Sequence, residues 1–304
     1  MPHQRYNLWT VDFDTPHEAQ IHAIKELLHS RRTPYQKIDV VMTYGYGKAL
    51  ILDGRLQSCQ RDEYIYHESL AHPVMLSGPG CERVLIIGGG EGSTLREVLR
   101  YPSVKEAVMV DIDRDVVEAC REHLVDFHRG AFDDPRATVI IDDGRDYVKN
   151  TADRFDVVII DISEPTEGGP AYTLYTVEFY ALVKDVLKDG GRVVTQACSS
   201  SLNVAETFSV ICNTVKRVFG SVHPYHCFIP SFGCTWGFAM WADEVSEMVS
   251  LDVDERLSER GVSGLAFYDG VTNRSLFCLP KDLRAVLSRE KRVFADENPP
   301  RLFR

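Results

Sequence analysis

The sequence predicts an α/β fold in which helices cover a mostly parallel sheet, with a smaller β-rich domain in front of it. Two observations lead to this prediction. After Gly80, short apolar runs rich in Val and Ile alternate with amphipathic stretches, which is the pattern of parallel strands buried on both faces. Before Arg61, short β-prone runs are separated by turns instead. We therefore expect two domains, residues 1–60 and residues 61–304.

Turn signals divide the N-terminal domain. The segment Tyr44–Gly47 separates two β-prone runs, Ile38–Thr43 and Lys48–Leu52, and so predicts a hairpin. Asp53-Gly54 forms a second turn that leads into another short strand. Earlier in the chain, the apolar residues within Ile21–Leu28 would also suit a helix, so their period alone leaves that stretch open between helix and strand.

The remaining elements follow in order along the chain. Arg61–Leu76 is expected to be a helix that ends near His72-Pro73, because a proline ring interrupts helical hydrogen bonding, and Ser77–Gly80 is a break. Strands are then expected at Val84–Ile87, Ala107–Val110, Thr138–Ile141, Phe155–Ile160 and Arg192–Thr195, and helices at Ser93–Arg100, Arg114–His123, after Asp143, at Thr176–Leu187 and at Val204–Phe219. Two last strands, near Val222–Phe228 and Gly237–Trp241, lie close together in the chain and predict an antiparallel edge.

The composition is that of a globular chain and limits its partners. Hydrophobic residues make up 44% of the 304 residues, and 45 acidic against 34 basic side chains give a formal net charge of −11. An acidic chain is a poor partner for phosphates, so we expect no nucleic acid and instead a cationic small molecule. We also expect no membrane association, because no apolar stretch approaches ~18 residues and the N-terminus lacks the layout of a signal peptide.

The cysteines and histidines predict neither cross-links nor a metal. The eight cysteines are scattered and form no C-x-x-C pair. We interpret them as buried thiols of a reducing compartment, which indicates the cytoplasm, and not as disulfides or zinc ligands. His223 and His226 lie near each other, but without a third ligand at a suitable spacing they predict no metal site.

Acidic residues or glycines close four successive predicted strands. The strand Val84–Ile87 runs into the glycine loop Gly88–Gly92, and the next three strands end at Asp111, at Asp142-Asp143-Gly144 and at Asp161. Each of these ends has an ordinary structural explanation as a turn glycine or a helix cap. Their repetition at the carboxyl edge, where open α/β sheets bind ligands, predicts a ligand site.

The glycine loop indicates the charge of the ligand. Its spacing is Gly88-x-Gly90-x-Gly92, not the G-x-G-x-x-G of dinucleotide sites, and it contains Glu91. A carboxylate in the loop repels a pyrophosphate and attracts a positive group, such as the amine or sulfonium of an adenosylmethionine-like molecule. We therefore expect no NAD and no prosthetic group, with Asp111 placed to hold a ribose.

Several motifs, taken in order, carry a family resemblance. They are Leu52-Asp53-Gly54-x-x-Gln57, Arg61-Asp62-Glu63-Tyr64-Ile65-Tyr66-His67-Glu68, Gly88-Gly89-Gly90-Glu91-Gly92, Arg96-Glu97, Asp111-Ile112-Asp113, Asp143-Gly144 and Gln196. Over residues 33–290 the chain resembles the polyamine aminopropyltransferases, the spermidine/spermine synthase family. The resemblance implies a small N-terminal β domain, in which Ile21–Leu28 is a strand, and a Rossmann-like domain of the class I methyltransferase type. It also implies a homodimer or a homotetramer.

The resemblance further implies an activity. Members of the family transfer the 3-aminopropyl group of decarboxylated S-adenosylmethionine, their co-substrate, to an amine and release 5′-methylthioadenosine. Three segments, Tyr66-His67-Glu68, Glu167–Thr176 and Ile229–Gly237, are similar to thermospermine synthases and favour the conversion of spermidine to thermospermine or spermine. Gly130–Arg136 is similar to enzymes that use agmatine or longer polyamines. Spermidine synthesis and agmatine aminopropylation therefore stay open as alternatives.

The family motifs imply roles for residues of this chain. Asp161 matches the catalytic aspartate, which binds the acceptor ammonium and accepts its proton. The residues expected around the co-substrate are Gln36, His67, Gly88, Gly90, Glu91, Asp111, Asp143 and Gly144. The residues expected around the polyamine are Tyr66, Glu164, Gln196, Phe232 and Trp236. Two positions depart from the family: Glu164 stands where an aspartate is usual, and Phe232 stands where spermidine synthases often have a tyrosine.

Two other classes of function compete with this one. A methyltransferase that uses intact S-adenosylmethionine would share the sheet and the strand-end acids, but Glu91 suits a donor tail without a carboxylate. A non-catalytic polyamine-binding paralogue would explain Glu164, but Asp161, Gln196 and the glycine loop argue against it. An aminopropyltransferase is the function that we expect.

Overall fold

The structure of the protein, a computed structural model, describes residues 8–166, 168–242 and 248–300. Its strands are β1 (Trp9–Thr15), β2 (Glu18–Arg32), β3 (Lys37–Thr43), β4 (Gly47–Leu52), β5 (Arg55–Cys59), β6 (Arg83–Gly88), β7 (Glu106–Asp111), β8 (Ala137–Ile141), β9 (Phe155–Asp161), β10 (Leu187–Ser199), β11 (His223–Ile229) and β12 (Cys234–Ala242). Its helices are α1 (Glu63–Leu76), α2 (Ser93–Leu99), α3 (Arg114–His123), α4 (Val125–His128), α5 (Gly144–Asn150), α6 (Val177–Asp185), α7 (Ala205–Phe219), α8 (Val253–Glu259), α9 (Gly270–Phe277) and α10 (Lys281–Arg289). Glu167, the first residue of one quoted motif, and the outer ends of the two predicted domains lie outside the described residues.

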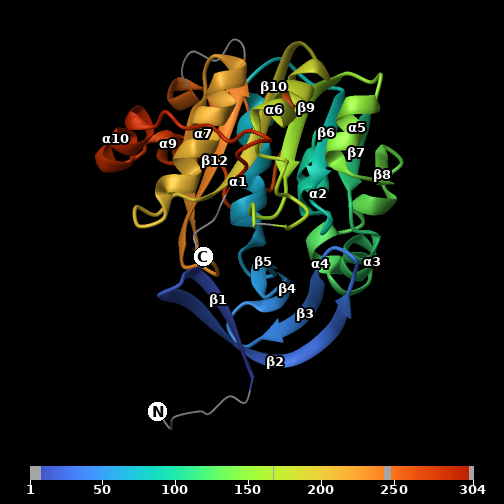
Figure 1. Ribbon diagram of the computed structural model, residues 1–304. Coiled ribbons are helices and arrows are strands. Elements are labelled where there is room, and N and C mark those ends of the chain that lie inside the picture. Colours follow the sequence, from blue (N-terminus) through green and yellow to red (C-terminus); the bar gives the residue numbers. More distant parts are fainter. Residues whose placement is uncertain (1–7, 167, 243–247, 301–304) are drawn as a thin grey trace.

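The strands form two sheets (Figure 1). The N-terminal sheet has five strands in the order β1-β2-β3-β4-β5, each antiparallel to the next. The large sheet has seven strands in the order β11-β12-β10-β9-β6-β7-β8, parallel from β10 to β8 and antiparallel at β12 and β11. The predicted mostly parallel sheet and its antiparallel edge are thus confirmed, while a domain boundary near residue 60 stays a prediction. In Figure 1 the N-terminal sheet, drawn in blue, curves below the large sheet.

The longest strand, β2, stands where hydrophobic period alone also permitted a helix. Ile21 and Leu27 are 58% and 52% exposed, so the apolar residues of this segment do not form the buried face that an amphipathic helix would have. The backbone of this segment pairs with β1 on one side and with β3 on the other. The strand implied by the family resemblance is therefore confirmed.

Helix α1 passes through Pro73, so the predicted end near His72-Pro73 is wrong. The helix continues to Leu76. A proline has no N–H to offer to the carbonyl of Ser69, four residues earlier. Tyr225 of β11 donates its hydroxyl to that carbonyl at 2.9 Å, so the buried acceptor keeps a partner and the helix can continue.

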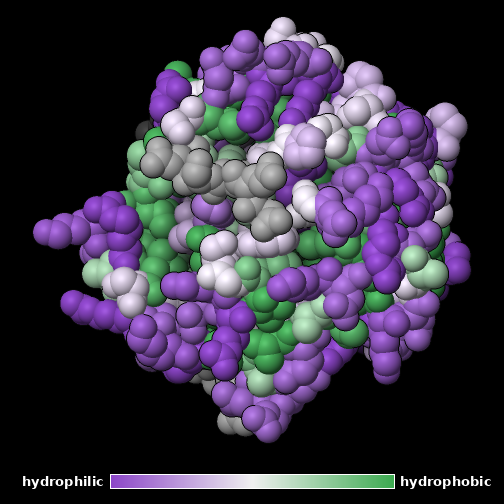
Figure 2. Space-filling model, turned by 90° about the horizontal axis from the view of Figure 1, so that it is seen from above, coloured by the Kyte–Doolittle hydropathy of each residue, from purple (hydrophilic) through white to green (hydrophobic). Residues whose placement is uncertain are grey.

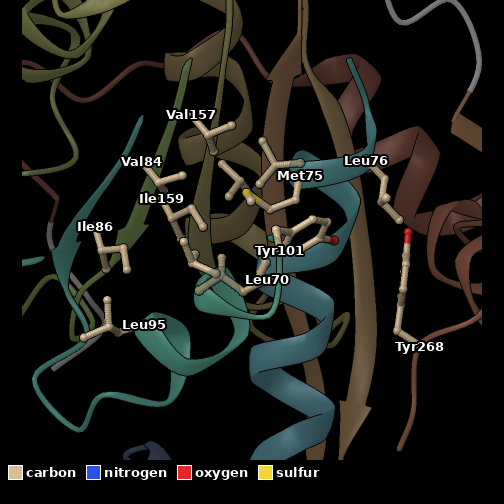
Figure 3. Close-up of a cluster of buried hydrophobic side chains, with 14 of the residues drawn as sticks. Leu70, Met75, Leu76, Val84, Ile86, Leu95, Tyr101, Val157, Ile159 and Tyr268 are labelled. Atoms are coloured by element: carbon tan, nitrogen blue, oxygen red, sulfur yellow. The ribbon is translucent and has the colours of Figure 1, made fainter. Parts of the chain in front are cut away.

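The core lies on both faces of the large sheet. On one face, Leu70 and Met75 of α1 point toward Val84, Val157 and Ile159 of β6 and β9 (Figure 3). On the other face, α5, α6 and α7 pack against the same strands in a second cluster of buried side chains. Helices therefore hold the parallel strands from both sides, while the carboxyl ends of β6, β7, β8 and β9 stay free for a ligand site.

The surface carries a strip of apolar side chains on the N-terminal sheet. Trp9, Val11 and Phe13 alternate along β1, and Ile21 of β2 pairs directly with Val11, so all four lie on one face; we call them the outer strip. Their exposed fractions run from 43% to 58%, high for large apolar side chains. Figure 2 shows a different face, seen from above, on which hydrophilic residues cover most of the rim. Within the described ranges, none of the helices combines the length and the apolar character that a bilayer-spanning segment requires.

No disulfide joins any of the eight cysteines, all of which lie in the described part of the chain. They are buried except for Cys234, which is half-buried, and Cys278, which is exposed. Burial raises the pKa of several of these thiols, Cys81 to about 11 for example, so they stay protonated at neutral pH. His226, one of the two histidines weighed as a metal ligand, makes a 2.9 Å hydrogen bond with Ser200 Oγ, and no group of His, Cys, Asp and Glu in the described part of the chain is arranged to hold a metal ion.

Candidate active site

A cleft opens between the N-terminal sheet and the carboxyl ends of β6, β7, β8 and β9. Its empty space is about 1040 Å³, the mouth included. Every residue that the sequence places around the co-substrate or the polyamine lines this one cleft: Gln36, Tyr66, His67, Gly88, Gly90, Glu91, Asp111, Asp143, Gly144, Asp161, Glu164, Gln196, Phe232 and Trp236. Leu50, Leu52, Leu56 and Gln57 complete the wall on the side of the N-terminal sheet. The site therefore needs both sheets.

Glycines let the loop after β6 pass close to the neighbouring strands. Gly88 has a φ of +81°, and a Cβ atom there would lie 2.2 Å from the carbonyl oxygen of Asp161. A Cβ atom on Gly90 would lie 2.6 Å from Oδ2 of Asp111. At Gly88 the backbone conformation and the neighbouring carbonyl exclude a side chain, and at Gly90 a side chain would displace the carboxylate of Asp111. The glycines therefore let the ends of β6, β7 and β9 come together around Glu91.

Two hydroxyl groups hold the carboxylate of Asp161 at the end of β9. Tyr66 of α1 donates to Oδ1 at 2.7 Å, and Thr94 of α2 donates to Oδ2 at 2.6 Å. Burial, together with the adjacent charge of Asp161, raises the pKa of Tyr66 well above its usual value, so the phenol stays protonated and acts as a hydrogen-bond donor. The two donors fix the orientation of the carboxylate, whose further lone pairs can accept a proton from a ligand in the cleft.

Glu91 begins a row of alternating charges that runs back into the protein. Nε2 of His67 lies 2.7 Å from Oε1 of Glu91, and Nδ1 lies 2.7 Å from the carbonyl oxygen and 3.0 Å from Oε2 of Glu63. Arg96 donates two hydrogen bonds of 2.9 Å to Glu63. Burial alone would lower the pKa of His67, but Glu91 and Glu63 outweigh it and raise that pKa to about 10. The ring is therefore a cation at neutral pH.

Two acids at the ends of β7 and β8 face the cleft. Burial raises the pKa of Asp111 to about 6, although backbone N–H groups of Asp113 and Gly90 favour its ionised form. Asp143 caps α5, because its Oδ1 accepts two backbone N–H groups at 2.7 and 3.1 Å. The cap uses only one oxygen of Asp143, so the residue serves the fold and also presents an acceptor to the cleft.

Glu164 is paired with a cation of the protein itself. Its Oε2 lies 2.5 Å from Nη2 of Arg55, at the start of β5. Arg55 is held in turn by β1, since its Nη1 donates to the carbonyl of Phe13 at 2.9 Å and its Nε lies 3.6 Å from Oδ1 of Asp12. The N-terminal sheet thus holds a positive charge against a carboxylate of the cleft wall.

Aromatic side chains form the wall at this end. The ring centroids of Phe232 and Trp236 lie 5.0 Å apart, and those of Phe232 and Tyr66 lie 6.5 Å apart, both edge to face. Nε1 of Trp236 is buried without a hydrogen-bond partner among the described residues. The wall therefore combines apolar area with one donor that a ligand can use.

The two predicted glutamines are anchored by the protein. Gln36 donates Nε2 to Oδ2 of Asp113 at 3.1 Å. Gln196 accepts the backbone N–H of Cys198 at 2.8 Å and donates to the carbonyl of Ile162 at 2.9 Å. Both side chains border the cleft, but most of their hydrogen bonds hold its walls in place.

Sequence reasoning did not identify four residues that shape the site, Arg55, Gln57, Thr94 and Asp113. Gln57 and Asp113 stand within quoted motifs, which is a signal that could have found them. Arg55 and Thr94 act through pairs with Glu164 and Asp161, residues far away in the chain, so only the folded structure reveals them.

The cleft is strongly acidic. Glu91, Asp111, Asp143, Asp161 and Glu164 line it, and no Lys or Arg is found among the described residues that do so. A site of this kind attracts cations and repels anions. With an oriented carboxylate at Asp161, it can also take a proton from a bound ammonium group.

Comparisons with known proteins give a consistent result. A family model described as "Spermine/spermidine synthase domain" matches residues 63–252, and one described as "Spermidine synthase tetramerisation domain" matches residues 8–59. A polyamine aminopropyltransferase of Sulfurisphaera tokodaii is 44% identical over 293 residues, which are 96% of this chain and 97% of that relative. One of Aeropyrum pernix is 45% identical over 295 residues, 95% of this chain and 94% of that relative.

Solved structures show the same similarity. A spermidine synthase from Thermotoga maritima superimposes with a TM-score of 0.86 at 30% identity and covers 94% of this chain and 96% of its own. A spermidine synthase in complex with the transition state analogue AdoDATO gives a TM-score of 0.87 at 30% identity, over 94% of this chain and 97% of that one. The predicted fold class is therefore confirmed over almost the whole chain.

Proposed function

The chain belongs to the spermidine/spermine synthase family of polyamine aminopropyltransferases, and from this we propose that it moves the 3-aminopropyl group of decarboxylated S-adenosylmethionine to spermidine. The proposed product is thermospermine or spermine, with 5′-methylthioadenosine released. The observation that carries the proposal is the single acidic cleft, in which Glu91 and the oriented carboxylate of Asp161 face the same space.

The donor half of the cleft is proposed around the glycine loop. Glu91 would hold the aminopropyl ammonium through Oε2, because Oε1 already faces His67. Asp111 would accept the ribose hydroxyls, and the oxygen of Asp143 that the helix cap leaves unused would accept the adenine amino group. Gln36 borders the same space. Gly88, Gly90 and Gly144 also line this half of the cleft. A Cβ atom at any of them would meet neighbouring protein atoms at 2.2 to 2.6 Å, so the glycines keep the backbone close to the strand ends.

The chemistry depends on freeing a lone pair on the acceptor. An aliphatic amine is protonated at neutral pH, since its pKa is about 10. Asp161 would accept that proton, and the neutral nitrogen would attack the carbon next to the sulfonium. The new C–N bond forms as the C–S bond breaks, and the electron pair of the C–S bond stays on sulfur as the neutral thioether. Tyr66 and Thr94 support this step by fixing the carboxylate.

The acceptor half is proposed along the aromatic wall. Tyr66, Phe232 and Trp236 offer apolar area to the methylene chain of a polyamine. Glu164 would hold a second ammonium, and Nε1 of Trp236 could donate to a neutral amine nitrogen. Gln196 would act by holding the loop after β9. A wall of this kind supports a long acceptor, which is why we favour spermidine over putrescine or agmatine.

The test is a panel of amines with the purified protein. Decarboxylated S-adenosylmethionine is mixed with putrescine, agmatine, spermidine or spermine, and release of methylthioadenosine is measured. We expect the highest kcat/KM with spermidine, and chromatography against thermospermine and spermine standards identifies the product. If none of the amines supports release of methylthioadenosine, the proposal is rejected. A higher kcat/KM with putrescine or agmatine would make that amine, and not spermidine, the acceptor.

A methyltransferase is the second candidate, favoured only by the sheet that both classes share. Calorimetry with S-adenosylmethionine and with its decarboxylated form separates the two. We expect the decarboxylated form to bind more tightly, because Glu91 repels the carboxylate of the intact methionine tail. Tighter binding of intact S-adenosylmethionine would support the methyltransferase.

We also propose a homodimer or homotetramer that assembles through the outer strip. The match of residues 8–59 to a tetramerisation domain supports a homo-oligomer. The exposed apolar side chains of β1 and β2 support the strip as the contact surface. The cytoplasm stays the predicted location, because free and mostly buried thiols suit a reducing compartment.

A further inference from the structure

Arg55 pairs with a carboxylate that lines the proposed polyamine end of the cleft. Its Nη2 lies 2.5 Å from Oε2 of Glu164, a charge-assisted hydrogen bond. Glu164 lines the cleft and is the carboxylate proposed to hold a second ammonium of the acceptor. The guanidinium therefore makes the same kind of contact that this ammonium would make.

The position of Arg55 does not depend on a ligand. The carbonyl of Phe13 accepts Nη1 at 2.9 Å, and Oδ1 of Asp12 lies 3.6 Å from Nε. Both contacts come from β1. The side chains of Arg55 and Glu164 are 27% and 13% exposed, so solvent screens their charges only in part.

Asp161 and Glu164 differ in the charge of their partners. The partners of Asp161 are two neutral hydroxyl groups, those of Tyr66 and Thr94. Glu164 is paired with a full positive charge, that of Arg55. A cation arriving at Asp161 meets an unopposed negative charge, whereas a cation arriving at Glu164 also meets the repulsion of Arg55.

We propose that Arg55 competes with the second ammonium of the acceptor for Glu164. It thereby limits the increase in acceptor affinity that each further positive charge on the acceptor provides. Arg55 is then a specificity-determining residue that acts through Glu164 and takes no part in the transfer itself. The inference rests on the proposed function and adds a rule of acceptor choice to it.

The experiment measures directly how much the second ammonium increases the affinity of an amine for the enzyme. Inhibition constants against the preferred acceptor are determined for α,ω-diamines of three to five carbons and for the monoamine of each length. The ratio of monoamine to diamine constants is compared between the wild type and Arg55→Gln. We expect the ratio to rise about threefold or more in Arg55→Gln at one or more chain lengths, the size of a partly screened charge contact.

Two variants control for charge and for structure. Arg55→Lys keeps the cation and should keep the wild-type ratio. Lys25→Gln removes one positive charge from an exposed position of β2 and should also keep it. An unchanged donor KM and melting temperature in Arg55→Gln show that the fold and the donor half are intact. If Arg55→Gln does not fold, Arg55→Met, which keeps the apolar stem, takes its place.

The outcomes are distinct. A ratio that is unchanged or lower at every chain length in the neutral variants would overturn the inference, because Arg55 would then only hold Glu164 in place. A rise that also occurs in Lys25→Gln would overturn it too, since overall charge would be the cause. If the wild type releases no methylthioadenosine with any amine, it is the proposed function that fails, and this result is seen before any variant is made.

Discussion

The imidazole of His67 and the carboxylate of Glu91 form a buried ion pair, with Nε2 at 2.7 Å from Oε1. Glu63 fixes the charge of the ring from its other side, and Arg96 fixes the charge of Glu63. The positive charge of His67 is therefore part of the folded structure, and it leaves one oxygen of Glu91 for a ligand.

This pair predicts a loss of stability at alkaline pH. The pKa of His67 is about 10 in the folded chain against 6.5 ordinarily, so its contribution is fully present below pH 6.5 and is lost as the pH rises through 10. Urea unfolding of the wild type and of His67→Gln should show a difference in free energy of unfolding that shrinks across this range, by up to about 1.4 kcal/mol per pH unit. Parallel curves would mean that the ring is neutral when folded.

Asp161→Asn should abolish the transfer and leave donor binding intact. An amide cannot accept the proton of the ammonium, so we expect kcat to fall by about 10²–10⁴-fold, the usual contribution of a general base. Calorimetry with decarboxylated S-adenosylmethionine should give a dissociation constant close to that of the wild type. Asp153→Asn, near the other end of β9 and 48% exposed, is the matched control and should be fully active. Normal turnover by Asp161→Asn would remove Asp161 from its proposed role.

Tyr66→Phe tests the orientation of that carboxylate. It removes the 2.7 Å hydrogen bond to Oδ1 and keeps the aromatic wall. We expect kcat/KM to fall by about 10-fold or more, as for the loss of a hydrogen bond to a charged group, and donor binding to be unchanged. Thr94→Val removes the donor to Oδ2 and should have a similar effect. An unchanged kcat/KM in Tyr66→Phe would show that Tyr66 only packs against the polyamine, because phenylalanine keeps the ring.

The buried ion-pair network around Glu97 should contribute to the stability of the fold. The buried Glu97 contacts Arg96 at 2.7 Å, Arg100 at 2.6 Å and His72 at 3.1 Å. Burial alone would raise its pKa, but the hydrogen bond from His72 and the charges of Arg96 and Arg100 lower it to about 2, so its contribution is present above pH 4.5 and is lost as the pH falls toward 2. Glu97→Gln should lower the free energy of unfolding at pH 7 by about 3–5 kcal/mol.

The exposed Glu82, which is paired with Lys105, provides the control for that measurement. Glu82→Gln should change the free energy of unfolding by less than about 1 kcal/mol. Equal effects of the two substitutions in urea unfolding would contradict the importance of the buried network. An effect of Glu97→Gln that does not shrink below pH 4.5 would contradict the assigned sign.

The outer strip should control assembly. Phe13→Glu places a charge among Trp9, Val11 and Ile21, where burying it against another copy is unfavourable. Size-exclusion chromatography with light scattering should show a smaller species than the wild type. Lys281→Glu, an exposed position on α10, is the control and should leave the mass unchanged. The same mass for Phe13→Glu and the wild type would place the contact elsewhere.

The large sheet could be predicted from the sequence because its signals are local. Val84–Ile87 and Phe155–Ile160 are short apolar runs, and residues at their carboxyl ends must meet at one edge. That geometry brings Glu91 and Asp161 into one cleft whatever the details of packing. The family resemblance added residues such as Gln36 and Trp236, which no strand end would have indicated.

The features that the sequence did not reveal depend on distant partners. The passage of α1 through Pro73 needs the hydroxyl of Tyr225, which comes from β11. The pairing of Glu164 needs Arg55 from the N-terminal sheet. Neither pair has a spacing that a local pattern can show, because the partners are more than a hundred residues apart in the chain.

The two faces of strand β1 have different roles, and the register of the strand determines which side chains lie on each face. Asp12 faces inward, where Oδ2 accepts the backbone N–H of Leu56 at 2.8 Å and Oδ1 faces Arg55, while Val11 and Phe13 face outward. Deleting one residue between Phe13 and the turn into β2 would turn the rest of the strand over and expose the acid while burying its apolar neighbours. This one-residue shift in register would disturb self-association and the choice of polyamine together, although it changes no residue that lines the cleft. A two-residue deletion would keep each remaining side chain on its original face of the strand.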